Sequence, residues 1–251
     1  MNYLPSVITI AAQAGQAILA IYQQDSSAFD ITGKADDSPL TAADLAAHRL
    51  IVAELARLTP QLPVLSEEAA DISWEIRQHW QRYWLVDPLD GTREFIKRNG
   101  EFTVNIALIE HGEPLLGVIH VPVSGKTYYA TKGGGSFLLC NGKPQQLHTK
   151  AVGDVVRVVG SRSHPSPQLA EYLTQFTQYE MIPVGSSLKF CLIAEGKADV
   201  YPRFNPTMQW DTAAGHIIAE EAGASVTFLD LTEKVYQREQ LLNPGFIVSS
   251  F

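Results

Sequence analysis

The sequence predicts a layered α/β fold built from two sub-domains, residues 1–150 and 151–251. Three patterns lead to this prediction. Two helical segments open the chain, a run of short apolar segments separated by glycine-containing turns follows, and strand and helix patterns alternate in the remainder. Consecutive short strands joined by such turns favour an antiparallel sheet. The change of pattern near residue 150 places the boundary between the sub-domains.

The first two elements are helices joined by a polar loop, residues 25–40. In residues 3–22, apolar side chains recur at helical spacing along one stripe. The second helix begins at Thr41, where Thr-Ala-Ala-Asp resembles a capping box, and runs to about Leu58. The predicted stripe of the first helix consists of Leu4, Val7, Ile8, Ala11, Gly15, Ile18, Leu19 and Tyr22.

The remaining elements follow from apolar runs and turn residues. Strands are expected at 63–65, 83–86, 102–109, 115–121, 126–131, 135–140, 155–159 and 198–201. Helices are expected at 167–176, 186–195 and 212–222. The turns His111-Gly112-Glu113 and Asn141-Gly142-Lys143 separate strands of the predicted antiparallel sheet.

Composition narrows the class of protein. The 251 residues are 45% hydrophobic and 18% charged, as in an ordinary soluble globular protein, and the net charge of −8 argues against affinity for nucleic acid polymers or anionic membranes. The two cysteines have no CxxC spacing, so neither a disulfide framework nor a zinc site is indicated. Because residues 3–22 lack a charged start and no run of 18 apolar residues occurs, we expect neither a signal peptide nor a transmembrane segment. The expected location is the cytoplasm, with peripheral attachment to the inner membrane left open.

The most informative motif is Asp87-Pro88-Leu89-Asp90-Gly91-Thr92. It follows an apolar strand, and two carboxylates three residues apart in a turn bring several oxygens to one place. Two further acidic elements also stand at element boundaries, Ser66-Glu67-Glu68 and Trp210-Asp211-Thr212. Oxygen-rich clusters of this kind suit hard divalent cations such as Mg²⁺. Each acidic residue alone could be a helix cap or turn residue, but the three elements together indicate a metal site.

These motifs resemble the inositol monophosphatase superfamily of Mg²⁺-dependent phosphatases. Asp-Gly-Thr-Arg-Glu-Phe from Asp90 onward and the segment 185–203 are similar to its bacterial 3'(2'),5'-bisphosphate nucleotidase branch, although Arg93 replaces that branch's lysine. The resemblance covers essentially the whole chain. It implies an αβαβα sandwich and two or three Mg²⁺ ions.

The resemblance also implies roles for individual residues. One ion would bind Glu67, Asp87 and the Leu89 carbonyl, and a second would bind Asp87, Asp90 and Asp211. Asp44 and Thr92 would activate the attacking water as the catalytic pair. The alternative for Asp44 is stabilisation of its helix dipole, and the alternative for Thr92 is a simple turn residue. The expected substrate contacts are Glu67, Leu89, Asp90, Gly91, Thr92, Ser161, His164, Gly185, Lys189 and Asp211.

The function implied by the resemblance is removal of the 3'-phosphate from adenosine 3',5'-bisphosphate, giving AMP and phosphate, with a role in sulfur assimilation. Lys189 would hold the 5'-phosphate, which favours a bisphosphate substrate over a monophosphate. Two alternatives stay open: an inositol or sugar phosphatase, and a metal-binding regulatory module without catalysis. The oligomeric expectation is a monomer or a homodimer.

Overall fold

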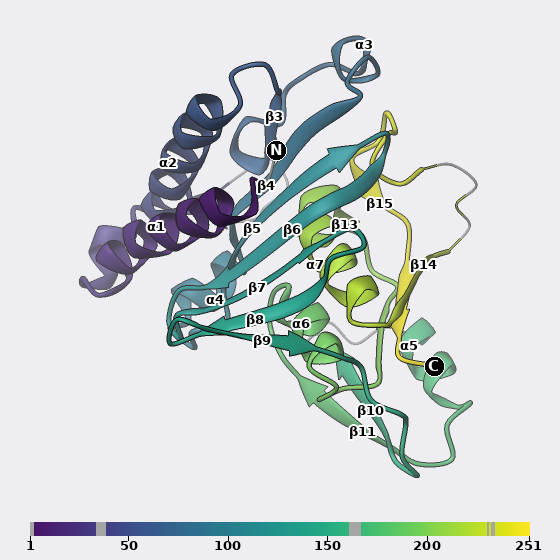
Figure 1. The fold of residues 1–251 in the computed structure, drawn as a ribbon. Helices are drawn as coiled ribbons and strands as arrows, with labels where there is room; N and C mark the ends of the chain where they lie inside the picture. Colours follow the sequence, from purple (N-terminus) through teal and green to yellow (C-terminus); the bar gives the residue numbers. More distant parts are fainter. Residues whose placement is uncertain (1–2, 34–38, 161–166, 230, 232–233) are drawn as a thin grey trace.

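The protein is built around a seven-stranded sheet with strand order β3-β4-β5-β6-β7-β8-β9 (Figure 1). The computed structural model describes residues 3–33, 39–160, 167–229, 231 and 234–251. β3 pairs with β4 in parallel, and every other neighbouring pair in this sheet is antiparallel. The strands are β3 (Val64–Ser66), β4 (Arg82–Asp90), β5 (Thr103–Glu110), β6 (Glu113–Val121), β7 (Lys126–Thr131), β8 (Gly135–Cys140) and β9 (Lys143–Leu147).

The predicted antiparallel strands are confirmed, with ends at most two residues from the expected positions. The turns behave as their residues require. His111 and Gly112 have φ of 50° and 74°, and Asn141 and Gly142 have φ of 51° and 72°, so both tight turns use the left-handed conformation that matches the twist of a hairpin. β9 was not predicted. Four of its five residues are exposed, so it lacks the alternating apolar pattern of a half-buried strand.

Helices α1 (Leu4–Tyr22) and α2 (Ala42–Leu58) lie side by side on one face of this sheet (Figure 1). Thr41 caps α2 with the predicted capping box: its side chain accepts from the backbone of the first turn, and Asp44 accepts from the Thr41 N–H at 2.8 Å. The buried face of α1 agrees with the predicted stripe at Val7, Ala11, Gly15 and Ile18 but also includes Ile10 and Ala14. Smaller residues let the helix approach the sheet, and Gly15 packs against the His120 ring so closely that a Cβ there would clash. The buried residues of α1 are Val7, Ile10, Ala11, Ala14, Gly15 and Ile18.

By length and hydropathy alone, α1 is the one helix in the described part of the chain that could cross a membrane. A core helix of a soluble protein and a signal sequence near the N-terminus can have the same length and hydropathy. Its buried residues share one hydrophobic cluster with residues of α2, β4, β5 and β6. In this structure α1 is therefore part of the core that covers the sheet.

Helices α6 (Leu188–Ala194) and α7 (Gln209–Glu221) form a layer between this sheet and a second one. The second sheet has strand order β11-β10-β12-β16-β14 and mixes parallel and antiparallel pairs. Its strands are β10 (Val156–Gly160), β11 (Tyr179–Pro183), β12 (Val200–Arg203), β14 (Ser225–Phe228) and β16 (Phe246–Ser249).

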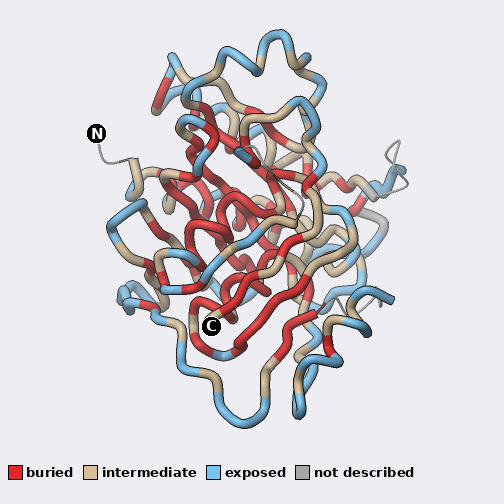
Figure 2. Tube along the Cα trace, turned by 90° about the vertical axis from the view of Figure 1, so that its right-hand side faces the viewer, coloured by how far each residue is buried: buried red, intermediate tan, exposed pale blue. Residues whose placement is uncertain are grey.

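Four hydrophobic clusters show that the layers follow in the order helix, sheet, helix, sheet, helix. Two clusters lie on opposite faces of the first sheet, against α1 and α2 and against α7. In the second sheet, Val159 and Tyr201 face α6 and α7, whereas Val158 and Val200 face α5 (Pro167–Leu173). Figure 2 shows these buried segments running through the middle of the molecule. The predicted αβαβα sandwich is thus confirmed.

The remaining elements are short. They are η1 (Ser26–Phe29), β1 (Thr32–Gly33), β2 (Pro39–Leu40), η2 (Glu67–Ala69), α3 (Trp74–Arg77), α4 (Thr92–Ile96), β13 (Thr207–Met208) and β15 (Leu242–Asn243).

Candidate active site

The ends of β3 and β4 bring the first two acidic residues together. These strands run parallel, with Ser66 opposite Val86, so Glu67 and Asp87 both follow a paired position. Carboxyl ends of parallel strands meet at one edge of a sheet, which is a usual place for ligand groups. The charge of Glu67 and a hydrogen bond with it both contribute to the raised pKa of Asp87.

A bulge turns the end of β4 toward the same point. Asp87 pairs with Asn105 and Asp90 with Thr103, so the β4 segment between them is one residue longer than its partner on β5. Pro88 has no N–H for the ladder, which favours a bulge here. The Leu89 N–H donates to Asp87 Oδ1 at 3.0 Å and closes a local turn. Asp87 and Asp90 therefore flank one turn, as their spacing predicts.

Helix α7 supplies the fourth carboxylate. Asp211 lies in its first turn and accepts from the Met208 N–H at 2.8 Å, which caps the helix. The pKa of Asp211 is raised well above its ordinary value, first by burial and then by the charges of Asp90 and Glu67. Asp211 therefore caps α7 and lies close to the other acidic residues. We call Glu67, Asp87, Asp90 and Asp211 the carboxylate cluster.

Like charge dominates the electrostatics of the carboxylate cluster. Burial raises the pKa of Asp87 well above its usual range, and the charges of Glu67, Asp90 and Asp211 raise it further. Buried carboxylates that repel one another need a counter-charge or a proton. Asp87 is 2% exposed, so bulk water supplies little relief.

The donor set fits hard divalent cations, because it consists of carboxylate oxygens beside backbone carbonyls. Across the described ranges, no three or more His, Cys, Asp or Glu side chains are arranged around a common point as ligands. Asp87 accepts from Leu89, Asp90 from Ser187 and Asp211 from Met208. The types of these residues fit the chemistry of the ion.

Thr92 and Asp44 meet beside the carboxylate cluster, as the predicted catalytic pair requires. Thr92 Oγ1 lies 3.1 Å from Asp44 Oδ1 and 3.4 Å from the Leu89 carbonyl oxygen. Asp44 is fully buried, and its other oxygen accepts from the N–H and the hydroxyl of Thr41 at 2.8 and 2.5 Å. Asp44 therefore caps α2 and holds Thr92 at the same time.

Gly91 makes the turn between the carboxylate cluster and α4. Its φ of 95° is left-handed, and a Cβ would lie 3.1 Å from the Glu101 carbonyl oxygen. A larger residue would be strained here, which explains glycine at this position. The sharp turn places Thr92 at the start of α4, two residues after Asp90.

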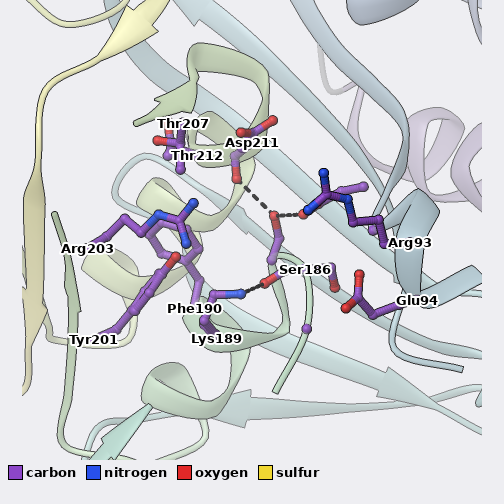
Figure 3. A pocket seen from close by; sticks show the side chains of 14 residues that line it. Arg93, Glu94, Ser186, Lys189, Phe190, Tyr201, Arg203, Thr207, Asp211 and Thr212 are labelled. Carbon is purple, nitrogen blue, oxygen red and sulfur yellow. Dashed lines mark hydrogen bonds between the residues drawn. The ribbon is translucent and has the colours of Figure 1, made fainter. Parts of the chain in front are cut away.

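A cavity of about 200 Å³ adjoins the carboxylate cluster (Figure 3). Asp211 stands at one side of it, Arg93 and Glu94 at another, and Lys189, Tyr201 and Arg203 below (Figure 3). The lining residues are Asp90, Gly91, Arg93, Glu94, Gly185, Ser186, Ser187, Lys189, Phe190, Tyr201, Arg203, Thr207, Asp211 and Thr212.

Lys189 is a buried cation in the wall of this cavity. Its ammonium donates to the Ser186 carbonyl at 2.6 Å and lies 5.5 Å from the centroid of the Tyr201 ring (Figure 3). Burial lowers its pKa to about 8, while the charge of Asp90 raises it in part. An anion bound in the cavity would raise this pKa and so favour the charged ammonium further. The cavity thus joins an acidic end, suited to cations, to a basic end with Lys189 and Arg203.

The structure brings together most of the predicted site residues. Gly185 lines the cavity, and its N–H donates to Glu101 Oε2 at 2.9 Å. Ser161 and His164 fall outside the described residues. Ser187 and Asn105 are 2% and 1% exposed and both hydrogen-bond to Asp90, a contact that the sequence did not predict for either residue. A polar residue inside the apolar strand 102–109 was the available signal for Asn105.

Comparison with known proteins agrees with this geometry. The 3'(2'),5'-bisphosphate nucleotidase CysQ of Escherichia coli K12 is 52% identical over 253 residues, covering 99% of this chain and all of that protein. The protein of the same name from Salmonella typhimurium is 52% identical over 249 residues, with the same coverage. The crystal structure of CysQ from Bacteroides thetaiotaomicron superposes with a TM-score of 0.85 at 45% identity, covering 96% of this chain and 95% of that one. The sequence pattern of the inositol monophosphatase family matches residues 3–250. The chain belongs to the inositol monophosphatase family.

Proposed function

We propose that this protein is a 3'(2'),5'-bisphosphate nucleotidase, a hydrolase that converts adenosine 3',5'-bisphosphate to AMP and phosphate. One observation carries the proposal: a single cavity is lined by Asp90 and Asp211 of the carboxylate cluster and also by the buried Lys189. A substrate with two phosphates can place one at each end. The 52% identity to nucleotidases over nearly the whole chain supports the same substrate class.

Enzymes of this family are generally Mg²⁺-dependent. In our proposal, Glu67, Asp87 and the Leu89 carbonyl hold one ion, and Asp87, Asp90 and Asp211 hold a second, with a third as a further possibility. Bound Mg²⁺ neutralises phosphate oxygens, lowers the pKa of a bound water and stabilises the leaving oxygen. The net charge of −8 then poses no obstacle to an anionic substrate, because substrate binding requires the metal.

Thr92 and Asp44 prepare the attacking water. The Thr92 hydroxyl has one proton, which Asp44 Oδ1 accepts at 3.1 Å, so the oxygen lone pairs of Thr92 are left to accept a hydrogen bond from water. Asp44 is held by Thr41 and cannot turn away without breaking the capping box of α2. The pair therefore orients the water and takes up its proton. The N–H groups of Gly91 and Thr92, at the turn beside the cluster, are proposed contacts of the scissile phosphate.

The other end of the cavity holds the rest of the substrate. Lys189 meets the 5'-phosphate, with Arg203 as a second cation in the same wall. The Ser186 hydroxyl lines the cavity and has no hydrogen-bond partner among the described residues, so it is available to a substrate oxygen. Gly185, Ser161 and His164 remain proposed contacts of the sugar and the 5'-phosphate. Glu67, Leu89, Asp90 and Asp211 contact the substrate on the metal side.

Three wider features belong to this proposal. The physiological role is recycling of the bisphosphate formed during sulfur assimilation, in the cytoplasm. The sub-domain boundary lies near residue 150, where the chain passes from the first sheet to the second. The oligomeric state is a monomer or a homodimer.

A substrate panel tests the function. Phosphate release is measured with adenosine 3',5'-bisphosphate, inositol 1-phosphate and fructose 1,6-bisphosphate, each with Mg²⁺ and with the metal chelated. The proposal requires the highest kcat/KM for the nucleotide and no turnover without metal. A preference for inositol 1-phosphate or fructose 1,6-bisphosphate would replace the substrate assignment. An absence of turnover with all three would leave a metal-binding module without catalysis.

A further inference from the structure

Ser187 occupies the junction between the metal side and the substrate side of the site. Its hydroxyl oxygen lies 2.6 Å from Asp90 Oδ2 and 2.8 Å from the backbone carbonyl oxygen of Asp211. Ser187 is 2% exposed, so these bonds compete little with water. One buried hydroxyl therefore touches the segments that carry two of the four carboxylates.

Asn105 on β5 completes this arrangement. Its side-chain amide donates to Ser187 Oγ at 2.9 Å and to Asp90 Oδ2 at 3.3 Å, and its own oxygen accepts from Thr103 Oγ1 at 3.0 Å. Both amide hydrogens are thus engaged, which fixes the orientation of the side chain. Asp90, Ser187 and Asn105 form a closed triangle of hydrogen bonds.

The Ser187 hydroxyl has a single hydrogen and two acceptors. It can donate to the Asp90 carboxylate or to the Asp211 carbonyl, but not fully to both. When a cation binds the Asp90 carboxylate, the Ser187 hydroxyl hydrogen can turn to the Asp211 carbonyl, so the hydroxyl still donates one hydrogen bond. The hydroxyl can therefore support the carboxylate cluster in both conditions.

The same loop continues directly to the basic end of the cavity. Ser186 has a left-handed φ of 47°, an uncommon conformation for serine that its surroundings must hold in place. Its carbonyl accepts from the Lys189 ammonium at 2.6 Å. Ser187 anchors this loop to Asp90, and Lys189 anchors it on the opposite side. The two contacts hold adjacent residues, Ser187 and Ser186, so a shift of one displaces the other.

We propose that Ser187, held by Asn105, is a positioning residue that fixes the Asp90 carboxylate for Mg²⁺ and couples metal binding to recognition of the distal phosphate. This inference rests on the proposed bisphosphatase function for its substrate side, whereas its metal side is independent of turnover. Residues that orient metal ligands typically contribute about 10- to 100-fold to metal affinity.

The first test measures Mg²⁺ binding by titration calorimetry on substrate-free protein. Ser187→Ala and Asn105→Ser should each weaken Mg²⁺ binding by about 10- to 100-fold. Ser136→Ala is the matched control, because Ser136 on β8 is fully buried and its hydroxyl has no hydrogen-bond partner among the described residues. Asn105→Ser carries the same prediction if Ser187→Ala does not fold. Mg²⁺ affinities of Ser187→Ala and Asn105→Ser equal to that of Ser136→Ala would overturn the inference.

The second test measures the coupling. The wild-type ratio of kcat/KM for adenosine 3',5'-bisphosphate over adenosine 3'-monophosphate should fall in Ser187→Ala at saturating Mg²⁺, and Ser136→Ala should keep it. The double variant Ser187→Ala/Lys189→Met should lower this ratio by a smaller factor than the product of the factors for the two single variants. Non-additive effects of this kind are expected for residues that share one interaction. A merely structural role would lower the thermal midpoint and leave the ratio unchanged. If the wild type hydrolyses neither nucleotide, the proposed function fails, and the Mg²⁺ titration still decides the role of Ser187.

Discussion

Replacing Lys189 by methionine removes the cation at the basic end of the cavity and keeps most of the side-chain volume. Lys189 is 7% exposed, so its ammonium is largely shielded from water and a contact with phosphate is weakly screened. A hydrogen bond to a charged group contributes about 1.5–3 kcal/mol. At 1.36 kcal/mol per factor of ten, this corresponds to a loss of about 10- to 150-fold in kcat/KM.

The assay compares two substrates that differ in one phosphate. Lys189→Met should lose about 10- to 150-fold in kcat/KM with adenosine 3',5'-bisphosphate and only a few-fold with adenosine 3'-monophosphate. Lys143→Met on the exposed strand β9 is the control for loss of a positive charge far from the cavity. Equal losses with both substrates would refute the reasoning, because Lys189 would then act only through the loop it holds.

The pH dependence gives an independent check on the same residue. Burial lowers the pKa of Lys189 to about 8, so the free enzyme carries the ammonium below this pH and loses it above. Because the dependence of kcat/KM on pH reports groups of the free enzyme, kcat/KM for the bisphosphate should fall as the pH rises through about 8. The difference between the two substrates should shrink over the same interval. A substrate difference that is constant from pH 7 to 9 would contradict this role.

Three further predictions follow from the described contacts. Thr92→Ala should lower kcat by about 10²–10⁴-fold with little change in KM, because it removes the hydroxyl between Asp44 and the attacking water. If steady-state kinetics showed a change in KM alone, Thr92 would be a substrate-binding residue instead. Asp90→Asn should abolish most turnover and weaken Mg²⁺ binding as measured by calorimetry. The metal-free variant should melt no lower than the wild type, because one of four clustered negative charges is gone. Full turnover of the variant at ordinary Mg²⁺ concentrations would contradict this prediction. His120 is buried, and burial lowers its pKa to about 4. As the pH falls below about 6.5, His120 therefore gains a proton in the unfolded chain before it does so in the folded protein. This difference should lower the free energy of unfolding by about 3 kcal/mol between pH 6.5 and pH 4. In urea unfolding, His120→Gln should lose stability less steeply over that interval, and an equal slope in both proteins would disprove it.

Local patterns in the sequence predict most elements of this fold, but the prediction lacks strands β9, β11, β14 and β16. The capping box at Thr41 and the hairpin turns at His111-Gly112 and Asn141-Gly142 formed as expected, because each depends on residues close in sequence. The exposed strand β9 could not be found by alternation. The contact face of α1 was predicted in part: Gly15, which packs against His120, lies on the predicted stripe, whereas the buried Ile10 and Ala14 do not.

The candidate site divides in the same way. The acidic motifs could be recognised in the sequence because they stand at the ends of strands and the start of a helix, where oxygen ligands often lie. The parallel pairing of β3 with β4 then brings Glu67 close to Asp87. Two of these carboxylates have a second role that depends on the tertiary structure. Asp44 and Asp211 cap helices while facing the site, and no local pattern shows both tasks. The hydrogen bonds of Ser187 span 97 residues to Asp90 and 82 to Asn105, so only the folded chain shows them.

The orientation of the substrate is the central claim, and the product of a single reaction tests it most directly. Adenosine 3',5'-bisphosphate is incubated with the enzyme and Mg²⁺, and the nucleotide product is identified by phosphorus NMR. With the 3'-phosphate at the carboxylate cluster and the 5'-phosphate at Lys189, the product must be AMP with its phosphate on the 5' position. Formation of adenosine 3'-monophosphate would mean that the substrate binds in the opposite direction, and it would contradict the account.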